Sequence, residues 1–314
     1  MLTVFAALVP VFLLIMLGFG LRRSLMKQDA MWVGIENLVY YVLFPALLID
    51  GLARADLRSA PIAGIGGALL LAVIAMTLLC LALRPVLARA FGLSGPSFTS
   101  LFQGATRWQT FVALSVAGNL WGQLGITLAS VAMVAMIPLL NVLSVWILAH
   151  YASPQRLAWP ALLRAIAKNP LIWGCVIGIA INVIGLPVPH PAHEFLDALG
   201  RSSLALGLLV VGAGLHLENL HKPGAPALLT IALKLVVMPL IAVSLGIAFG
   251  LTGTSLAVVA CCSSVPSASN GYVLARQMGG DAPMLAQILT IQTALAVLTM
   301  PIVIAFAEKG SLFP

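Results

Sequence analysis

Charged side chains are scarce in this sequence. Only 8% of the 314 residues are charged, 61% are hydrophobic, and the mean hydropathy is +1.10. Soluble domains carry roughly 25% charged residues, and a chain this apolar cannot stay solvated as a disordered protein either. The composition therefore predicts an integral membrane protein that works inside a lipid bilayer.

The sequence also lacks the motifs of several functional classes. It has no HExxH motif, no Walker motif and no GxSxG motif with catalytic partners. The sequence therefore shows no catalytic motif for the hydrolysis of peptides, esters or nucleotides. The net charge is +7, but no basic run is interleaved with aromatic residues, which argues against a nucleic-acid partner. The four cysteines lie in apolar runs without disulfide or metal spacing. We expect no enzyme activity, no metal and no resident cofactor.

Apolar runs between charged or Pro/Gly-rich breaks predict an all-α protein with ten transmembrane helices. Each crossing takes about 20 apolar residues, and the chain is long enough for ten with short connections. The expected spans, numbered in chain order, are 2–21, 31–52, 61–83, 97–120, 124–149, 169–186, 194–215, 225–249, 253–277 and 284–306.

The distribution of Lys and Arg predicts the orientation of these spans. If the N-terminus is outside, ten basic residues fall in cytoplasmic connections and three on the opposite side. The positive-inside rule then places both termini on the outer, periplasmic side of a bacterial inner membrane. The ten are Arg22, Arg23, Lys27, Arg84, Arg89, Arg156, Arg164, Lys168, Lys222 and Arg276, and the three are Arg54, Arg58 and Lys309.

A weak internal duplication divides the chain into two halves. Pro10 and Pro170 lie 160 residues apart, and residues 106–122 lie over residues 265–281 at about the same offset. We therefore expect a first five-helix repeat at 1–151, a cytoplasmic linker at 152–168 and a second repeat at 169–314. Two five-helix halves must insert with opposite orientation, and such inverted repeats are typical of alternating access.

The ninth span contains a polar cluster in an otherwise apolar stretch. Pro266 removes a backbone donor, and the serines and the asparagine between Ser263 and Asn270 offer substitute hydrogen-bond partners. A helix that is broken within the membrane must bury its freed backbone groups or line a wet cavity. We predict such a break, with an ordinary proline kink as the alternative.

The fourth span carries Arg107 about ten residues from either end, where a guanidinium is costly without a partner. Either it pairs with a buried carboxylate, or it serves as an anion site in a polar cavity. The acids are few. Most belong to connections, Glu36 and Asp50 lie near the two ends of span two, and Asp197 is four residues from Arg201 on the same helix. We therefore favour the anion site.

The two interrupted spans indicate that the expected site has a positive electrostatic potential. New half-helices would begin near Phe111 and Ala268, and helix N-termini favour anions. With Arg107 between them, a carboxylate fits best. Trp108 and Tyr272 would then contact an apolar part of the substrate or simply pack. Four more polar residues line the same cavity or hold helices together, and for Lys234 the alternative is to snorkel to the cytoplasmic edge. These four are Asn141, Lys234, Gln287 and Gln292.

Several stretches along the whole chain resemble the auxin efflux carrier family of transporters. They are Asn37–Ile49, Lys168–Pro170, Gly207–Leu215, Lys234–Pro239 and Val265–Asp281. The resemblance implies ten helices in two inverted repeats, with broken helices four and nine crossing at the midplane of the membrane. It also implies a scaffold from spans 1, 2, 6 and 7 and a transport domain from spans 3, 4, 5, 8, 9 and 10.

Members of this family move organic anions, with the substrate bound where the broken helices cross. Carried over by position, the substrate-binding residues are Arg107, Trp108, Gln109 and Thr110 on span four and Pro266, Ser267, Ser269 and Asn270 on span nine, with Tyr272 beside them. In span four the chain departs from the Gly-Asn run or proline of many members.

We therefore expect a secondary transporter that moves a small organic anion across the membrane by alternating access, without ATP. The first alternative is a sodium-coupled symporter of the bile-acid type. The second is a membrane-embedded enzyme acting on a lipid-linked phosphate, which would need an acid/base pair near Arg107. Coupling to Na⁺ or H⁺ and assembly into a homodimer remain open at the level of the sequence.

Overall fold

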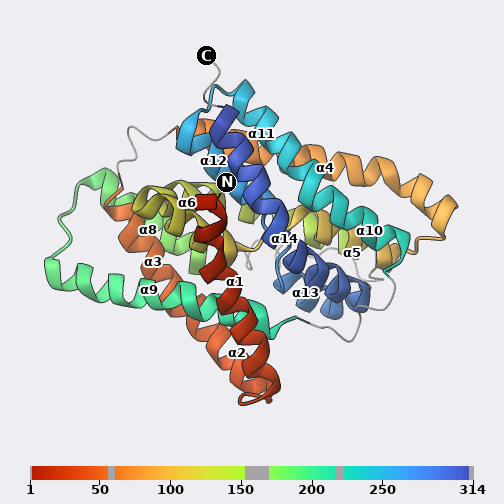
Figure 1. Cartoon of the computed structure of the whole chain (residues 1–314), viewed down its shortest axis with the longest axis horizontal. Helices are drawn as coiled ribbons and strands as arrows, with labels where there is room; N and C mark the ends of the chain where they lie inside the picture. The colour runs from red at the N-terminus through yellow and green to blue at the C-terminus, as the bar shows by residue number, and fades with distance from the viewer. Residues whose placement is uncertain (1, 56–60, 153–169, 216–222, 311–314) are drawn as a thin grey trace.

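The computed structural model describes residues 2–55, 61–152, 170–215 and 223–310, and all regular structure in these ranges is helical, without strands (Figure 1). The all-α prediction is confirmed. The helices are α1 (Leu2–Arg23), α2 (Asp29–Leu38), η1 (Val39–Leu43), α3 (Phe44–Ala53), α4 (Ile62–Phe91), α5 (Gly95–Thr106), α6 (Thr110–Tyr151), α8 (Pro170–Ile184), α9 (His190–Ala213), α10 (Ala225–Ala232), η3 (Leu233–Val237), α11 (Met238–Ala248), α12 (Gly253–Ser264), α13 (Asn270–Met278) and α14 (Ala282–Gly310).

Seven helical stretches of the described chain are long and apolar enough to cross a membrane, and α8 and α12 are shorter apolar helices. One of the seven, 95–151, has 57 residues and contains both α5 and α6. Within α6 the chain turns at Gly122, whose φ of 56° and ψ of −140° suit glycine, and this turn separates the predicted spans four and five. The predicted linker at 152–168 lies outside the described residues except for Ala152.

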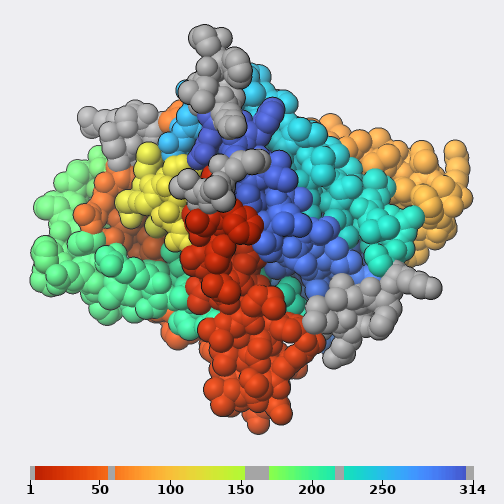
Figure 2. Space-filling model, viewed as in Figure 1, coloured from red at the N-terminus to blue at the C-terminus, as the bar shows by residue number. Residues whose placement is uncertain are grey.

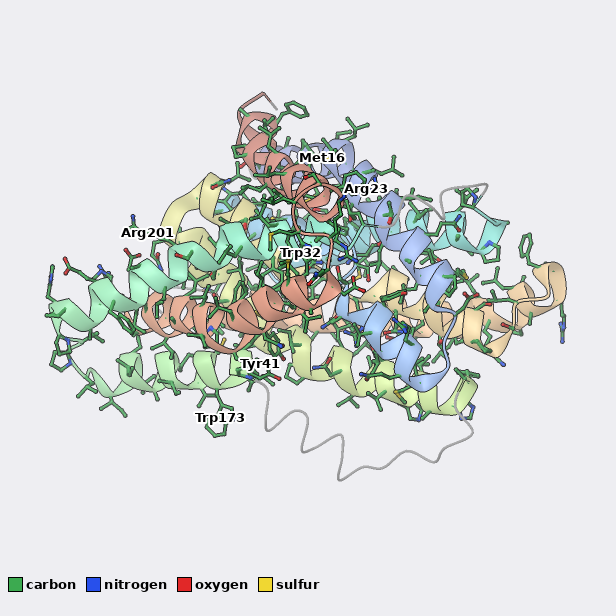
Figure 3. All side chains as sticks on the ribbon, turned by 90° about the horizontal axis from the view of Figure 1, so that it is seen from below. Met16, Arg23, Trp32, Tyr41, Trp173 and Arg201 are labelled. Atoms are coloured by element: carbon green, nitrogen blue, oxygen red, sulfur yellow. The ribbon has the colours of Figure 1, made fainter. Side chains whose placement is uncertain are left out.

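The outer surface of the helices is strongly apolar. Large hydrophobic side chains are exposed on α1, α4, α8 and α14, among them Leu78, Trp173 and Phe306. Figure 3 shows Met16 and Trp173 pointing away from the body, on α1 and α8. An exterior of this kind is suited to contact with lipid rather than water, which agrees with the membrane protein predicted from composition.

The helices pack in two groups. The first helical group consists of α1, α2, η1, α3, α8 and α9, in which α3 lies against both α8 and α9, and α1 lies against α9. The second helical group consists of α4, α5, α6 and all elements from α10 to α14, in which α12 packs on α6 and α14, and α4 packs on α6 and α11. In Figures 1 and 2, α1 runs along the front between α9 and α14.

Two short π-helical segments interrupt long helices, one in each group. Segment η1 precedes Pro45 and segment η3 precedes Pro239, and each proline stands in the first turn of the helix that follows. Because proline has no backbone N–H and clashes with the preceding turn, the helix widens locally rather than continuing in α geometry. Such widened turns occur often at functional sites, and here η1 carries Tyr40 and Tyr41 while η3 carries Lys234.

Candidate functional site

The second helical group contains two interrupted helices. α5 ends at Thr106, α6 begins at Thr110, and Arg107 between them has an extended backbone. Likewise α12 ends at Ser264 and α13 begins at Asn270, so the chain around Pro266 is not helical. Both breaks stand where the sequence predicts them, and the second is a true interruption rather than a kink.

The two breaks bind each other. The backbone N–H of Gln109 donates to the carbonyl oxygen of Pro266 at 2.9 Å, and the Ser267 hydroxyl donates to the carbonyl oxygen of Gln103 at 2.9 Å. Helix ends leave backbone donors and acceptors unpaired. Each of these two bonds pairs such a backbone group of one break with a group of the other break. The crossing point is therefore held by backbone hydrogen bonds as well as by side chains.

Gln292 on α14 connects both breaks from behind. Its Nε2 donates to the carbonyl oxygen of Gly104 at 3.0 Å, and its Oε1 accepts from the backbone N–H of Ser267 at 3.0 Å. The side chain is fully buried. Of the two roles that the sequence left open for Gln292, the contacts indicate the bonding of helix to helix.

A cavity of about 290 Å³ opens where the two breaks meet, between the two helical groups. Its residues come from α2, η1, the two breaks and the starts of α6 and α13, with a few from α6, α8 and α9. The polar ones are Glu36, Asn37, Tyr40, Tyr41, Arg107, Trp108, Gln109, Thr110, Asn141, Ser269 and Asn270, and the apolar ones are Phe111, Ile137, Leu140, Leu171, Val210, Val211 and Ala268.

Arg107 is the positive charge of this cavity. Its side chain is buried, Nη1 donates to Oδ1 of Asn270 at 2.7 Å, and Nε has no hydrogen-bond partner. In the described part of the chain it forms no ion pair with a carboxylate, so the alternative of a buried acid pair is not realised. Asp197 instead pairs with Arg201 at 2.7 Å, as expected.

The surroundings of Arg107 add to its positive potential. The N-terminal ends of α6 and α13 both border the cavity, through Thr110 and Asn270. Helix N-termini carry partial positive charge and free N–H groups. The indole Nε1 of Trp108 is also buried without a partner among the described residues. The site therefore offers a guanidinium and two helix N-termini, which together suit an anion.

Glu36 also borders this cavity, which was not predicted from the sequence. Glu36 lies near one end of the predicted second span, but α2 brings it to the same cavity as Arg107. Tyr40, four residues further, also lines the cavity, as expected for neighbours on one helix face. Nothing in the sequence around Glu36 reveals this contact, because it depends on the packing of α2 and η1 beside the two breaks.

Besides Gln292, five predicted residues do not border the cavity in the described structure. Pro266 and Ser267 are buried within the crossing of the breaks, where they bond to Gln109 and Gln103. Tyr272 lies on α13 and Gln287 on α14, and both are partly buried. Lys234 has 0% exposure, so the alternative that it snorkels to the cytoplasmic edge is not realised either. The helices that pack around η3 enclose it completely.

Comparison with known proteins places these features in a family. The model of the membrane transport protein family matches residues 152–304. The chain is also 25% identical, over 300 residues, to an "Uncharacterized transporter" of Methanothermobacter thermautotrophicus, covering 93% of this chain and 94% of that protein. These matches to membrane transport proteins support the similarity of the chain to the auxin efflux carrier family. The resemblance seen in the sequence motifs is confirmed.

A second relative of this chain matches over a shorter length. It is a protein of Rhizobium meliloti named "Putative malonate transporter", 28% identical over 152 residues, which are 48% of this chain and 47% of that protein. The chain spans about half the length of this relative and nearly all of the archaeal one. All of these matches are to transporters, which agrees with the expectation that the chain is not an enzyme.

Proposed function

We propose that this transporter is a secondary carrier of a small organic anion, a carboxylate, which it moves by alternating access. The observation that carries the proposal is Arg107, a buried guanidinium without a carboxylate partner among the described residues, at a cavity where two interrupted helices meet. Intramembrane charges of this kind mark substrate pathways by default. The N-termini of α6 and α13 at the same cavity favour negative charge over positive.

The proposed architecture has ten spans in two inverted five-helix repeats, in a bacterial inner membrane with both termini on the periplasmic side. In it, the first helical group acts as the scaffold and the second helical group carries the substrate. Phe111 supports this division, because it lines the cavity and packs edge-on against Phe44 of the first group, with ring centroids 5.0 Å apart. A sliding or rocking motion of one group on the other would expose the cavity to either side in turn.

The dimensions of the cavity favour a short substrate. A volume of about 290 Å³ lies at the lower end of ligand pockets, which run from about 300 to 1,000 Å³. Apolar side chains, including Phe111, Leu140 and Leu171, form the remainder of the wall. A carboxylate with a few carbon atoms matches this combination. The name of the Rhizobium meliloti relative, which refers to malonate, is consistent with a short dicarboxylate.

The test uses the purified protein and a panel of organic acids. We expect short mono- and dicarboxylates to raise the thermal unfolding midpoint, and amines of the same length to leave it unchanged. In proteoliposomes, internal unlabelled acid should drive uptake of the labelled acid by saturable counterflow. Stabilisation by amines alone would contradict an anion site, and flux without counterflow would indicate a channel rather than a carrier.

Glu36 leads to a prediction about substrate charge. Because Glu36 borders the same cavity as Arg107, a second carboxylate on the substrate meets a like charge there. Replacing Glu36→Gln should therefore raise the affinity for doubly charged dicarboxylates by about 3- to 10-fold, since like charges several ångströms apart repel by roughly 1 kcal/mol in partly solvated sites. The affinity for monocarboxylates should change less. Binding can be measured by isothermal calorimetry at constant ionic strength.

The matched control is Glu194→Gln, because Glu194 is an exposed acid on α9 that faces His190 and does not border the cavity. Its replacement should leave both affinities unchanged. A loss of affinity in Glu36→Gln would instead mean that Glu36 accepts a hydrogen bond from the substrate, or pairs with a positive group on it, and the repulsion argument would be wrong.

A further inference from the structure

Phe111 belongs both to the cavity and to the contact between the two helical groups. It stands in the first turn of α6, just after the break at Arg107, and its side chain lines the cavity. α6 packs against α1, α3 and α9 of the first helical group. Phe111 therefore connects the wall of the cavity to the surface on which the second group would move.

A notch in the first helical group receives the ring of Phe111. A Cβ atom added to Gly207 on α9 would lie 2.5 Å from Cδ1 and 2.8 Å from Cγ of Phe111, closer than real side chains approach, so the ring lies directly on the glycine. Phe44 on α3 meets the same ring edge-on, with centroids 5.0 Å apart, in a geometry that aromatic pairs prefer. Gly207 and Phe44 together form the Phe111 seat.

Two other glycines of α9 serve the packing of the first group itself. A Cβ atom at Gly200 would lie 3.0 Å from the Cα atom of Leu47 on α3, and one at Gly212 would collide with the backbone of Ile15 on α1. These glycines let helices of one group approach closely. Gly207 differs from both, because the atoms for which it makes room belong to the second group. Its missing side chain therefore serves the contact between the groups.

The residues of the cavity indicate which conformation the structure represents. In the proposed orientation, spans two and six begin at the cytoplasmic side and span seven ends there. Glu36, Leu171 and Val211 lie in the cytoplasmic halves of these three spans, and all three line the cavity. The cavity therefore faces the cytoplasm, and the Phe111 seat is a contact of the inward-facing conformation.

We propose that the Phe111 seat is a conformational lock, which holds the carrier in the inward-facing conformation and releases the Phe111 ring when the second helical group moves to the outward-facing one. The inference rests on the proposed function in that it assumes alternating access. It does not depend on the identity of the substrate, because the balance of the two conformations can be measured without one.

The experiment measures from which side of the membrane the cavity can be reached. The reporter variant is Ser269→Cys, since Ser269 lines the cavity. All four native cysteines are buried, so a membrane-impermeant maleimide should label the introduced thiol alone. In the reporter variant, we expect faster labelling in inverted membrane vesicles, where the reagent meets the cytoplasmic side, than in right-side-out vesicles.

Two further substitutions in the reporter variant should release the lock. Gly207→Ala places a methyl group where the ring now lies, and Phe111→Leu removes the ring but keeps an apolar side chain. Each should slow labelling in inverted vesicles and speed it in right-side-out vesicles. The ratio of the two rates should change by about 3- to 10-fold, which corresponds to one aromatic pair of ordinary strength. The combined variant should change it by less than the product of the two, because both substitutions act on one contact.

The matched control is Gly200→Ala, which adds a methyl group against Leu47 within the first group. It should lower the thermal unfolding midpoint and leave the ratio of labelling rates unchanged. An equal change of the ratio in Gly200→Ala would show that the effect is not specific to the Phe111 seat, and would contradict the proposal.

A Gly207→Ala variant that folds and keeps the ratio of the reporter variant would overturn the lock, and so would a change in the opposite direction. If Gly207→Ala does not fold, Phe111→Leu decides by the same criterion. Labelling from one side only in every variant would also overturn the lock, while counterflow of a labelled carboxylate by the intact protein would still support the proposed function. Failure of every carboxylate to bind, with the ratio changed as expected, would contradict the proposed substrate alone.

Discussion

Replacing Arg107→Gln is expected to weaken carboxylate binding by about 30-fold or more, since truncating one partner of a buried charged pair costs about 2–5 kcal/mol. The reason lies in the isolation of the guanidinium: it bonds to Asn270, its Nε is unpaired, and no acid in the described structure neutralises it. The substrate carboxylate would supply the missing partner. Affinity can be measured by calorimetry or by the concentration dependence of the thermal shift.

Two further variants separate charge from geometry. Arg107→Lys keeps the charge but cannot bind a carboxylate through two parallel hydrogen bonds, so its affinity should fall between those of the intact protein and Arg107→Gln. Arg201→Gln is the matched control. Arg201 points outward from α9 in Figure 3, its side chain is 80% exposed, and it pairs with Asp197 on the same helix. Unchanged binding in Arg107→Gln together with an intact fold would contradict the proposed site.

The features that the sequence could predict are those set by local chemistry. The break at Pro266 follows from a proline flanked by serines and an asparagine, because these residues destabilise a helix and solvate its open ends. The break at Arg107 was expected because the auxin efflux carrier family, which the sequence resembles, has its fourth and ninth helices broken. The interruptions between Thr106 and Thr110 and between Ser264 and Asn270 confirm both.

The features that could not be predicted depend on which helices become neighbours. Glu36 joins the cavity because α2 and η1 pack beside the breaks, and nothing within α2 itself reveals that contact. For Lys234, the apolar run around it allows either a side chain that reaches the membrane edge or one that is fully enclosed. Only the packing of η3 against α5, α12 and α14 decides for enclosure.

The second large effect is expected for stability, in the variant Gln292→Met. The side chain of Gln292 is the single group that satisfies both the backbone N–H of Ser267 and the carbonyl oxygen of Gly104 from α14. Methionine has a similar length but cannot form either bond. Each buried polar group left unpaired costs about 1–3 kcal/mol, so the variant should lose about 2–6 kcal/mol, seen as a fall of several degrees in the thermal unfolding midpoint.

The comparison with Gln277→Met tests whether this loss comes from the breaks. Gln277 is an exposed glutamine on α13, so its replacement should change stability by less than about 0.5 kcal/mol. If Gln292 also holds the breaks in register, carboxylate affinity should fall in Gln292→Met, because Arg107 and Asn270 both lie next to the segments it joins. A variant as stable as the intact protein would mean that the two backbone groups find other partners, and that α14 does not fix the crossing.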